Sequence, residues 1–119
     1  MPACGWSRAV RLRKSADFER VQRHGKRIVG QHLLIVHLHN VVGPRFGLAV
    51  SRKVGNAVVR NRVKRWLRQA LRLQQAQAGP RDVVVVARPS AATAGYPALY
   101  REVGAALASF HRSPPETDV

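Results

Sequence analysis

The segment between Asn56 and Arg72 separates apolar from cationic residues with the periodicity of a helix. At about 100° of rotation per residue, the apolar residues share one side: Val59, Val63, Trp66, Leu67 and Ala70. The opposite side carries Arg60, Asn61, Lys64, Arg65, Arg68 and Arg72. Asn56 is suited to cap this helix, because its side chain can accept a hydrogen bond from the first turn. The apolar stripe has to be buried, so the rest of the chain must supply an apolar face for it.

The cationic side of this helix opposes helix formation in an isolated chain. Arg or Lys residues recur four positions apart, and each like-charged pair costs roughly 0.2–0.5 kcal/mol. No Asp or Glu lies between Arg20 and Arg81, and the chain has 21 Lys and Arg against 6 Asp and Glu, a formal net charge of +15. A solvated helix face usually mixes both signs of charge. The pattern therefore favours a polyanionic partner, and nucleic acid is the first candidate.

Apolar runs on both sides of the basic helix predict a sheet against which it packs. The run from Val83 to Val86 predicts a central buried strand, which Pro89 ends. The expected strands are 26–30, 33–38, 45–51 and 82–88; the expected helices begin at Ser15, Asn56 and Pro97 and end at Gly25, Gly79 and Arg112. This order, α-β-β-β-α-β-α, predicts an α/β (α+β) sandwich in which helices pack on a four-stranded sheet.

The length of the chain fits one domain. Residues 15–112 are expected to form that domain, after a flexible basic arm at 1–14 and before a disordered tail at 113–119. The single cysteine, Cys4, excludes an internal disulfide and a cysteine-rich zinc site, and it is expected to be a bystander rather than a nucleophile.

No apolar run approaches the roughly 20 residues that span a bilayer, and the first ten residues lack the apolar core of a signal peptide. The cytoplasm is therefore the expected compartment, and no membrane partner is expected. A membrane-surface role for the basic helix would need apolar residues that a domain of this size requires for its own core.

The titratable residues do not form a catalytic constellation in the sequence. A nuclease needs carboxylates arranged around magnesium or a His pair for acid and base catalysis, and the six acids are scattered: Asp17, Glu19, Asp82, Glu102, Glu116 and Asp118. His37 and His39 would share one face of a strand, with His32 nearby, which could suggest a metal pair. Because no third ligand lies close in sequence, partly exposed strand positions are the favoured interpretation, and no metal site is expected in the protein.

Five segments resemble, in order and spacing, the bacterial ribonuclease P protein family. The most specific is Gly55-Asn56-Ala57 followed by Arg60-Asn61-Arg62. The segments are Arg11-Leu12-Arg13-Lys14, Asp17-Phe18, Arg23-His24-Gly25, the run from Phe46 to Arg65, and Val86-Ala87-Arg88-Pro89. The resemblance covers about Arg11 to Phe110. It implies a ribosomal protein S5 domain 2-like fold, with a left-handed crossover through the basic helix although most parallel crossovers are right-handed.

The resemblance also implies a function. The chain would be the protein subunit of a ribonucleoprotein whose catalytic RNA removes the 5′ leader of precursor tRNA in a magnesium-dependent hydrolysis. The Mg2+ ions would be bound mainly by the RNA subunit and the substrate, and the protein alone would be inactive. No obligate protein partner is evident. The alternative is a ribosomal or chaperone-like RNA-binding protein of the same fold.

Site residues follow from the same resemblance, and none of them is catalytic. The catalytic RNA would be contacted by Arg52, Lys53, Asn56, Arg60, Asn61, Arg62, Lys64, Arg65 and Arg68. The leader would be bound by Phe18, Gln22, Val36, Arg45 and Arg88. Gln22 and Val36 stand where the family often has aromatic residues, so the leader is expected to be held more by charge than by stacking.

Overall fold

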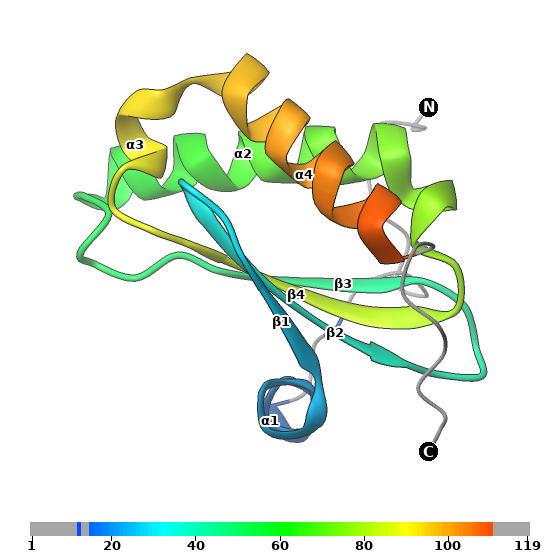
Figure 1. Cartoon of the computed structure of the whole chain (residues 1–119). Coiled ribbons are helices and arrows are strands. Elements are labelled where there is room, and N and C mark those ends of the chain that lie inside the picture. Colours follow the sequence, from blue (N-terminus) through cyan, green and yellow to red (C-terminus); the bar gives the residue numbers. More distant parts are fainter. Residues whose placement is uncertain (1–11, 13–14, 111–119) are drawn as a thin grey trace, which may run out of the picture.

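The computed structural model describes Leu12 and residues 15–110, which form one mixed sheet covered by helices on both faces (Figure 1). The strand order is β1-β2-β4-β3. The strands are β1 (Lys26–Val29), β2 (Leu33–His39), β3 (Arg45–Ala49) and β4 (Arg81–Ala87). β1 pairs antiparallel with β2, β2 pairs antiparallel with β4, and β3 pairs parallel with β4. The predicted central strand is therefore confirmed, because β4 has a neighbour on each side.

The helices lie in two layers on either side of the sheet. α1 (Ser15–His24) covers one face, and α2 (Ala57–Gln74) and α4 (Tyr96–Phe110) cover the other, as Figure 1 shows. Two short pieces connect these elements: the 3-10 helix η2 (Gln75–Ala78) after α2, and α3 (Ala91–Ala94) before α4. The α1 layer and the α2/α4 layer therefore present separate surfaces.

Alternating side chains of the strands supply a core to each layer. Ile35 and Val85 point to the α2/α4 side, where they join a large cluster that includes Phe46, Leu67 and Phe110. The α1 side holds a smaller cluster of Leu12, Val21, Val36 and Val84, with Phe18 packed against it. Both faces of β4 are buried, which is why its four valines are consecutive and do not alternate with polar residues.

The predicted element order is confirmed, and the basic helix begins as predicted. Asn56 Oδ1 accepts a hydrogen bond from Val59 N at 3.0 Å. η2 and α3 were not predicted, since elements of four residues are too short to show a period. Gly79, with φ +68°, ends η2 in a conformation that favours glycine. The handedness of the β3-α2-β4 crossover stays a prediction.

Leu12 belongs to the folded domain, although it precedes the expected range. Its side chain is 4% exposed, and its N–H donates to Phe46 O at 2.9 Å. The predicted start of the domain at Ser15 therefore leaves out Leu12, which packs against the sheet. The rest of the predicted arm, the tail, and residues 111–112 lie outside the described residues.

Candidate nucleic-acid interface

The residues predicted to bind the catalytic RNA lie together on α2 and on the turn that leads into it. We call seven of them the α2 cationic surface: Arg52, Lys53, Arg60, Arg62, Lys64, Arg65 and Arg68. Asn61 lies on the same exposed side, and Asn56 caps the helix. Asn56 can cap the helix and also contact RNA, because its side chain remains exposed.

The predicted apolar stripe of α2 faces the core, and the cations flank it or lie opposite. Val63, Leu67 and Ala70 are fully buried, whereas Val59 and Trp66 are only partly buried at the edge of the cluster. The sequence did not predict that Leu71 and Gln74 extend the buried face at the C-terminal end. Among the cations, Arg52, Lys53, Arg65 and Arg68 are exposed, while Arg60, Arg62 and Lys64 are half-buried.

The positive charge of α2 is not neutralised by the described part of the chain. Within residues 12 and 15–110, no carboxylate forms an ion pair with a cation of α2. Arg72 Nη2 donates to Gln69 Oε1 at 2.9 Å, and the Arg62 guanidinium lies 5.4 Å from the centroid of the Trp66 ring. The like-charge repulsion that destabilises this helix can therefore be relieved by phosphates, whose binding would release counterions.

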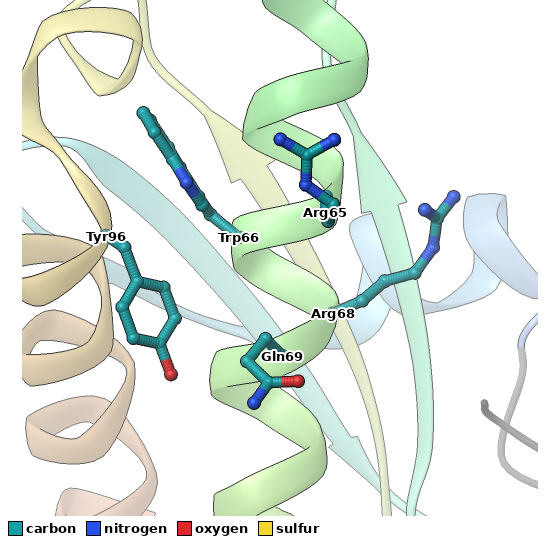
Figure 2. A pocket seen from close by; sticks show the side chains of 5 residues that line it. All are labelled: Arg65, Trp66, Arg68, Gln69 and Tyr96. Atoms are coloured by element: carbon teal, nitrogen blue, oxygen red, sulfur yellow. The ribbon is translucent and has the colours of Figure 1, made fainter. Parts of the chain in front are cut away.

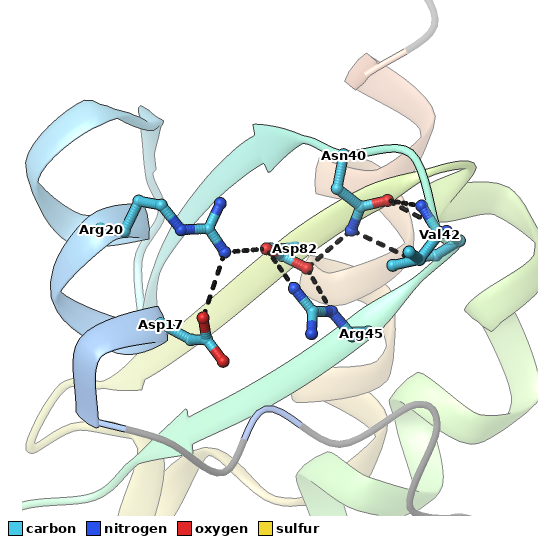
Figure 3. Close-up of polar contacts among 7 residues, drawn as sticks. Asp17, Arg20, Asn40, Val42, Arg45 and Asp82 are labelled. Carbon is cyan, nitrogen blue, oxygen red and sulfur yellow. Dashed lines mark hydrogen bonds and ion pairs between the residues drawn. The ribbon is translucent and has the colours of Figure 1, made fainter.

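On the opposite face of the sheet, two arginines and an asparagine surround the buried carboxylate of Asp82 (Figure 3). Arg20 Nη2 donates to Oδ2 at 2.7 Å, and Arg45 donates from Nε to Oδ1 at 2.8 Å and from Nη2 to Oδ2 at 3.0 Å. Asn40 Nδ2 donates to Oδ1 at 2.6 Å. Arg20 also lies 3.4 Å from Asp17 Oδ1. This network joins α1, β3, β4 and the turn after β2.

The hydrogen bonds of this network decide the charge state of Asp82. Burial alone would raise the pKa of Asp82, but the hydrogen bonds from Arg45, Asn40 and Arg20 outweigh it and place the pKa below its ordinary value. The bond to Asp82 in turn raises the pKa of Arg45. The carboxylate is therefore ionised at neutral pH, and together with Asp17 it balances the positive charges of Arg20 and Arg45.

Phe18 and Gln22 are the predicted leader-binding residues that lie on the surface of α1. Phe18 is half-buried, with its ring over Gly47 of β3, and Gln22 is exposed. A partly exposed ring of this kind can stack on a base. The geometry of these two residues is therefore compatible with the predicted role.

The structure does not bring the other three predicted leader residues to a common surface. Val36 is 1% exposed beneath α1, so the prediction that it contacts the leader is wrong. Arg45 is 27% exposed, and its guanidinium is bound to Asp82. Arg88 lies six residues beyond Asp82, about 20 Å along the strand direction, where its Nη1 donates to Gly30 O at 3.1 Å.

His37 is packed into the domain and is not partly exposed as predicted. It is 7% exposed, and its ring centroid lies 4.0 Å from that of Phe110 in α4. Arg81 covers the Phe110 ring at 5.0 Å, and His39 is exposed. In the described part of the chain, no group of three or more His, Cys, Asp or Glu residues is placed to hold a metal ion.

Two features of the interface were missed from the sequence. Arg20 completes the Asp82 network, and the only sequence signal for it is its position three residues after Asp17. Trp66 and Tyr96 line a hollow between α2 and α4, although the sequence places Trp66 in the apolar stripe.

None of the described helices is both long and apolar enough to span a membrane.

An α+β domain with an unneutralised basic helix on one layer has the surface expected of the RNA-binding class of proteins. A family model described as Ribonuclease P matches residues 6–111. The ribonuclease P protein component of Syntrophus aciditrophicus is 35% identical over 102 residues, which cover 84% of this chain and 86% of that protein. That of Bacillus velezensis is 40% identical over 83 residues, covering 68% and 72%.

Solved structures agree with the sequence comparison. The ribonuclease P protein of Staphylococcus aureus superposes with a TM-score of 0.77 at 26% identity, covering 87% of this chain and 95% of that one. The protein from Thermotoga maritima gives a TM-score of 0.74 at 26% identity, covering 82% and 94%. The chain therefore belongs to the ribonuclease P protein family, the protein subunits of the ribonucleoprotein endoribonuclease that matures the 5′ end of tRNA. This confirms the predicted function and not the ribosomal or chaperone-like alternative.

Proposed function

We propose that this subunit joins the catalytic RNA through the α2 cationic surface. The observation that carries the proposal is the absence of any ion pair between these cations and the carboxylates of residues 12 and 15–110. Arg52 and Lys53 extend the surface along the turn before α2, and Arg65 and Arg68 present exposed guanidinium groups. Arginine suits this role because its planar fork can form two parallel hydrogen bonds with one phosphate.

The leader of precursor tRNA would bind on the α1 side of the sheet. Phe18 offers a half-exposed ring on the side of the sheet where Arg20 and Arg45 pair with Asp17 and Asp82. A single stacking ring fits a single-stranded leader that is bound without strong sequence readout. Gln22, exposed on α1, would add a polar contact to the same strand.

The Mg2+ ions of the reaction would be held by the RNA subunit and the substrate phosphates. The described carboxylates are a poor fit for a metal site, because Asp82 is bound by two arginines and Asp17 by one. Glu102 accepts hydrogen bonds from the backbone N–H groups of His32 and Leu33. The protein would therefore bind and position RNA without cleaving it. Since the substrate is precursor tRNA, the working compartment would be the cytoplasm.

Capture of cellular RNA on the tagged full-length chain tests the proposal. The expected result is one dominant RNA of a few hundred nucleotides, together with precursor tRNA. Replacing Arg62, Arg65 and Arg68 by Ala should remove the dominant RNA. Recovery of mainly ribosomal RNA, or of the same dominant RNA by the variant, would contradict the proposed role of the α2 cationic surface.

A further inference from the structure

The surface between α2 and the beginning of α4 contains a hollow of about 590 Å3. It is lined by Arg65, Trp66, Arg68, Gln69 and Tyr96. Figure 2 shows that Trp66 and Tyr96 extend from different helices into the space between them, while the guanidinium groups of Arg65 and Arg68 lie away from α4. The hollow is therefore aromatic between the helices and cationic along its α2 rim, in the size range of small-ligand sites.

The residues of the hollow combine the groups that recognise an unpaired nucleotide. Trp66 and Tyr96 are partly buried against the core, which fixes them while leaving ring surface accessible. Gln69 Oε1 accepts a hydrogen bond from Arg72, and Figure 2 shows the Gln69 nitrogen on the side toward Tyr96, where it can donate to the edge of a base. Arg65 and Arg68 are exposed and can bind the phosphates on either side of that base.

We propose that this hollow receives one unpaired base of the catalytic RNA, stacked on Trp66 and Tyr96 with its flanking phosphates on Arg65 and Arg68. The inference rests on the proposed contact between the α2 cationic surface and that RNA. Charge complementarity selects the occupant, because two members of that surface form the rim of the hollow. The leader is the less suitable occupant, since its proposed surface lies on the α1 side of the sheet (Figure 1).

Tryptophan fluorescence can report on the hollow directly. The chain has two tryptophans, Trp6 and Trp66, so a Trp6→Phe protein carries its only indole in the hollow. Stacking on a base quenches indole emission, and we expect a clear loss of emission when the catalytic RNA is added. Emission that is unchanged on assembly would overturn the inference. Quenching that requires precursor tRNA, and is absent with the catalytic RNA alone, would assign the hollow to the substrate and overturn it as well.

Substitution tests whether Trp66 contributes binding or only packing. Trp66→Leu keeps an apolar side chain at the edge of the core but removes the flat ring. If the ring stacks on a base, the Kd of assembly with the catalytic RNA should rise about fivefold to a hundredfold. Chemical probing of that RNA should show weaker protection at one or two unpaired nucleotides. Leu73→Ala, which removes a 53% exposed side chain of α2 outside the hollow, is the matched control and should leave both unchanged.

The outcomes separate this inference from the proposed function. If the parent protein binds the catalytic RNA and Trp66→Leu binds it equally well with the same protections, the inference fails while the proposed function stands. If the parent protein does not bind that RNA, both fail. If Trp66→Leu lowers the melting temperature below the assay range, the Trp6→Phe fluorescence decides, because that protein retains Trp66.

Discussion

The ring of Phe18 lies directly on the backbone of Gly47, so that a methyl group at position 47 would come within 2.5 Å of Phe18 Cζ. This contact anchors one edge of the ring to β3, while the side chain remains half-exposed on α1. Phe18 is therefore held in place by the fold and also available to a ligand. A side chain at position 47 would force the ring to shift.

Phe18→Leu should weaken the binding of precursor tRNA by the holoenzyme by about 1–3 kcal/mol if the ring stacks on a leader base. Leu retains most of the buried apolar volume, so the melting temperature should change little. Mature tRNA lacks the leader, and its affinity should stay the same. Equal affinities of the parent and the variant for precursor tRNA would show that Phe18 serves packing only.

Gly47→Ala should destabilise the fold by displacing the Phe18 ring. The added methyl group forces the Phe18 ring to shift, and overpacking of this kind costs about 1–3 kcal/mol of folding free energy. Combining Gly47→Ala with Phe18→Leu should recover part of that cost, because the smaller side chain relieves the clash. Urea denaturation of the four proteins in this cycle measures the coupling, and strictly additive effects would contradict the contact.

Asp82→Asn should lower the free energy of unfolding by about 2–3 kcal/mol at neutral pH. Removing one partner of a buried ion pair leaves its cations uncompensated. The loss of unfolding free energy is smaller than for a fully buried pair, because Arg20 and Arg45 keep contact with water. The folded-state pKa of Asp82 is lowered, so this stabilisation is present above the ordinary carboxyl pKa of about 4 and is lost as the pH falls through the folded-state pKa.

Urea denaturation at several pH values checks the sign of this effect. The difference in unfolding free energy between the parent and Asp82→Asn should be full at about pH 7 and should shrink progressively below about pH 4. A difference that grows as the pH falls, or its absence at neutral pH, would contradict the assignment of Asp82 as an ionised, arginine-bound carboxylate.

Replacing Arg60, Arg62 and Arg65 by Ala should weaken assembly with the catalytic RNA and reduce its dependence on salt. Each phosphate that the variant no longer binds should lower the magnitude of the salt slope by roughly 0.7–0.9. None of these three side chains occupies a buried position of α2, so circular dichroism should show a folded protein. Filter binding of the RNA at increasing salt measures the slope.

A matched variant controls for the reduction in net charge. Arg23, Arg27 and Arg101 are exposed on α1, β1 and α4, outside the α2 cationic surface. Their replacement by Ala removes the same three charges but should leave most of the salt slope intact. Equal slopes for the two triple variants would mean that the net charge of the protein, and not α2, determines assembly.

Much of the fold could be predicted because its signals are local. The cap at Asn56, the stripe of α2 and the run of valines in β4 are each contained within one segment. The pairing of Arg45 with Asp82 was not predictable, since the two residues are 37 positions apart and meet only through the parallel pairing of β3 with β4. The hollow was missed for the same reason, because Trp66 and Tyr96 come from different helices.

The residues predicted to bind the catalytic RNA lie on one surface, whereas the predicted leader residues do not. Consecutive residues of one helix keep their relation to each other, so Arg60, Asn61 and Arg62 remain on one element. The predicted leader residues lie on α1, β2 and β3 and directly after β4, and sequence position does not say how deeply each is buried. Val36 shows this limit, since its strand crosses beneath α1 and its side chain belongs to the smaller core cluster.

Reconstituted cleavage of precursor tRNA tests most directly whether the protein is an RNA-dependent subunit. The purified protein, the catalytic RNA, and the two together are each incubated with precursor tRNA and magnesium at physiological salt. We expect specific cleavage at the leader junction by the complex and none by the protein alone. Magnesium-dependent cleavage at that junction by nuclease-treated, RNA-free protein would contradict the account.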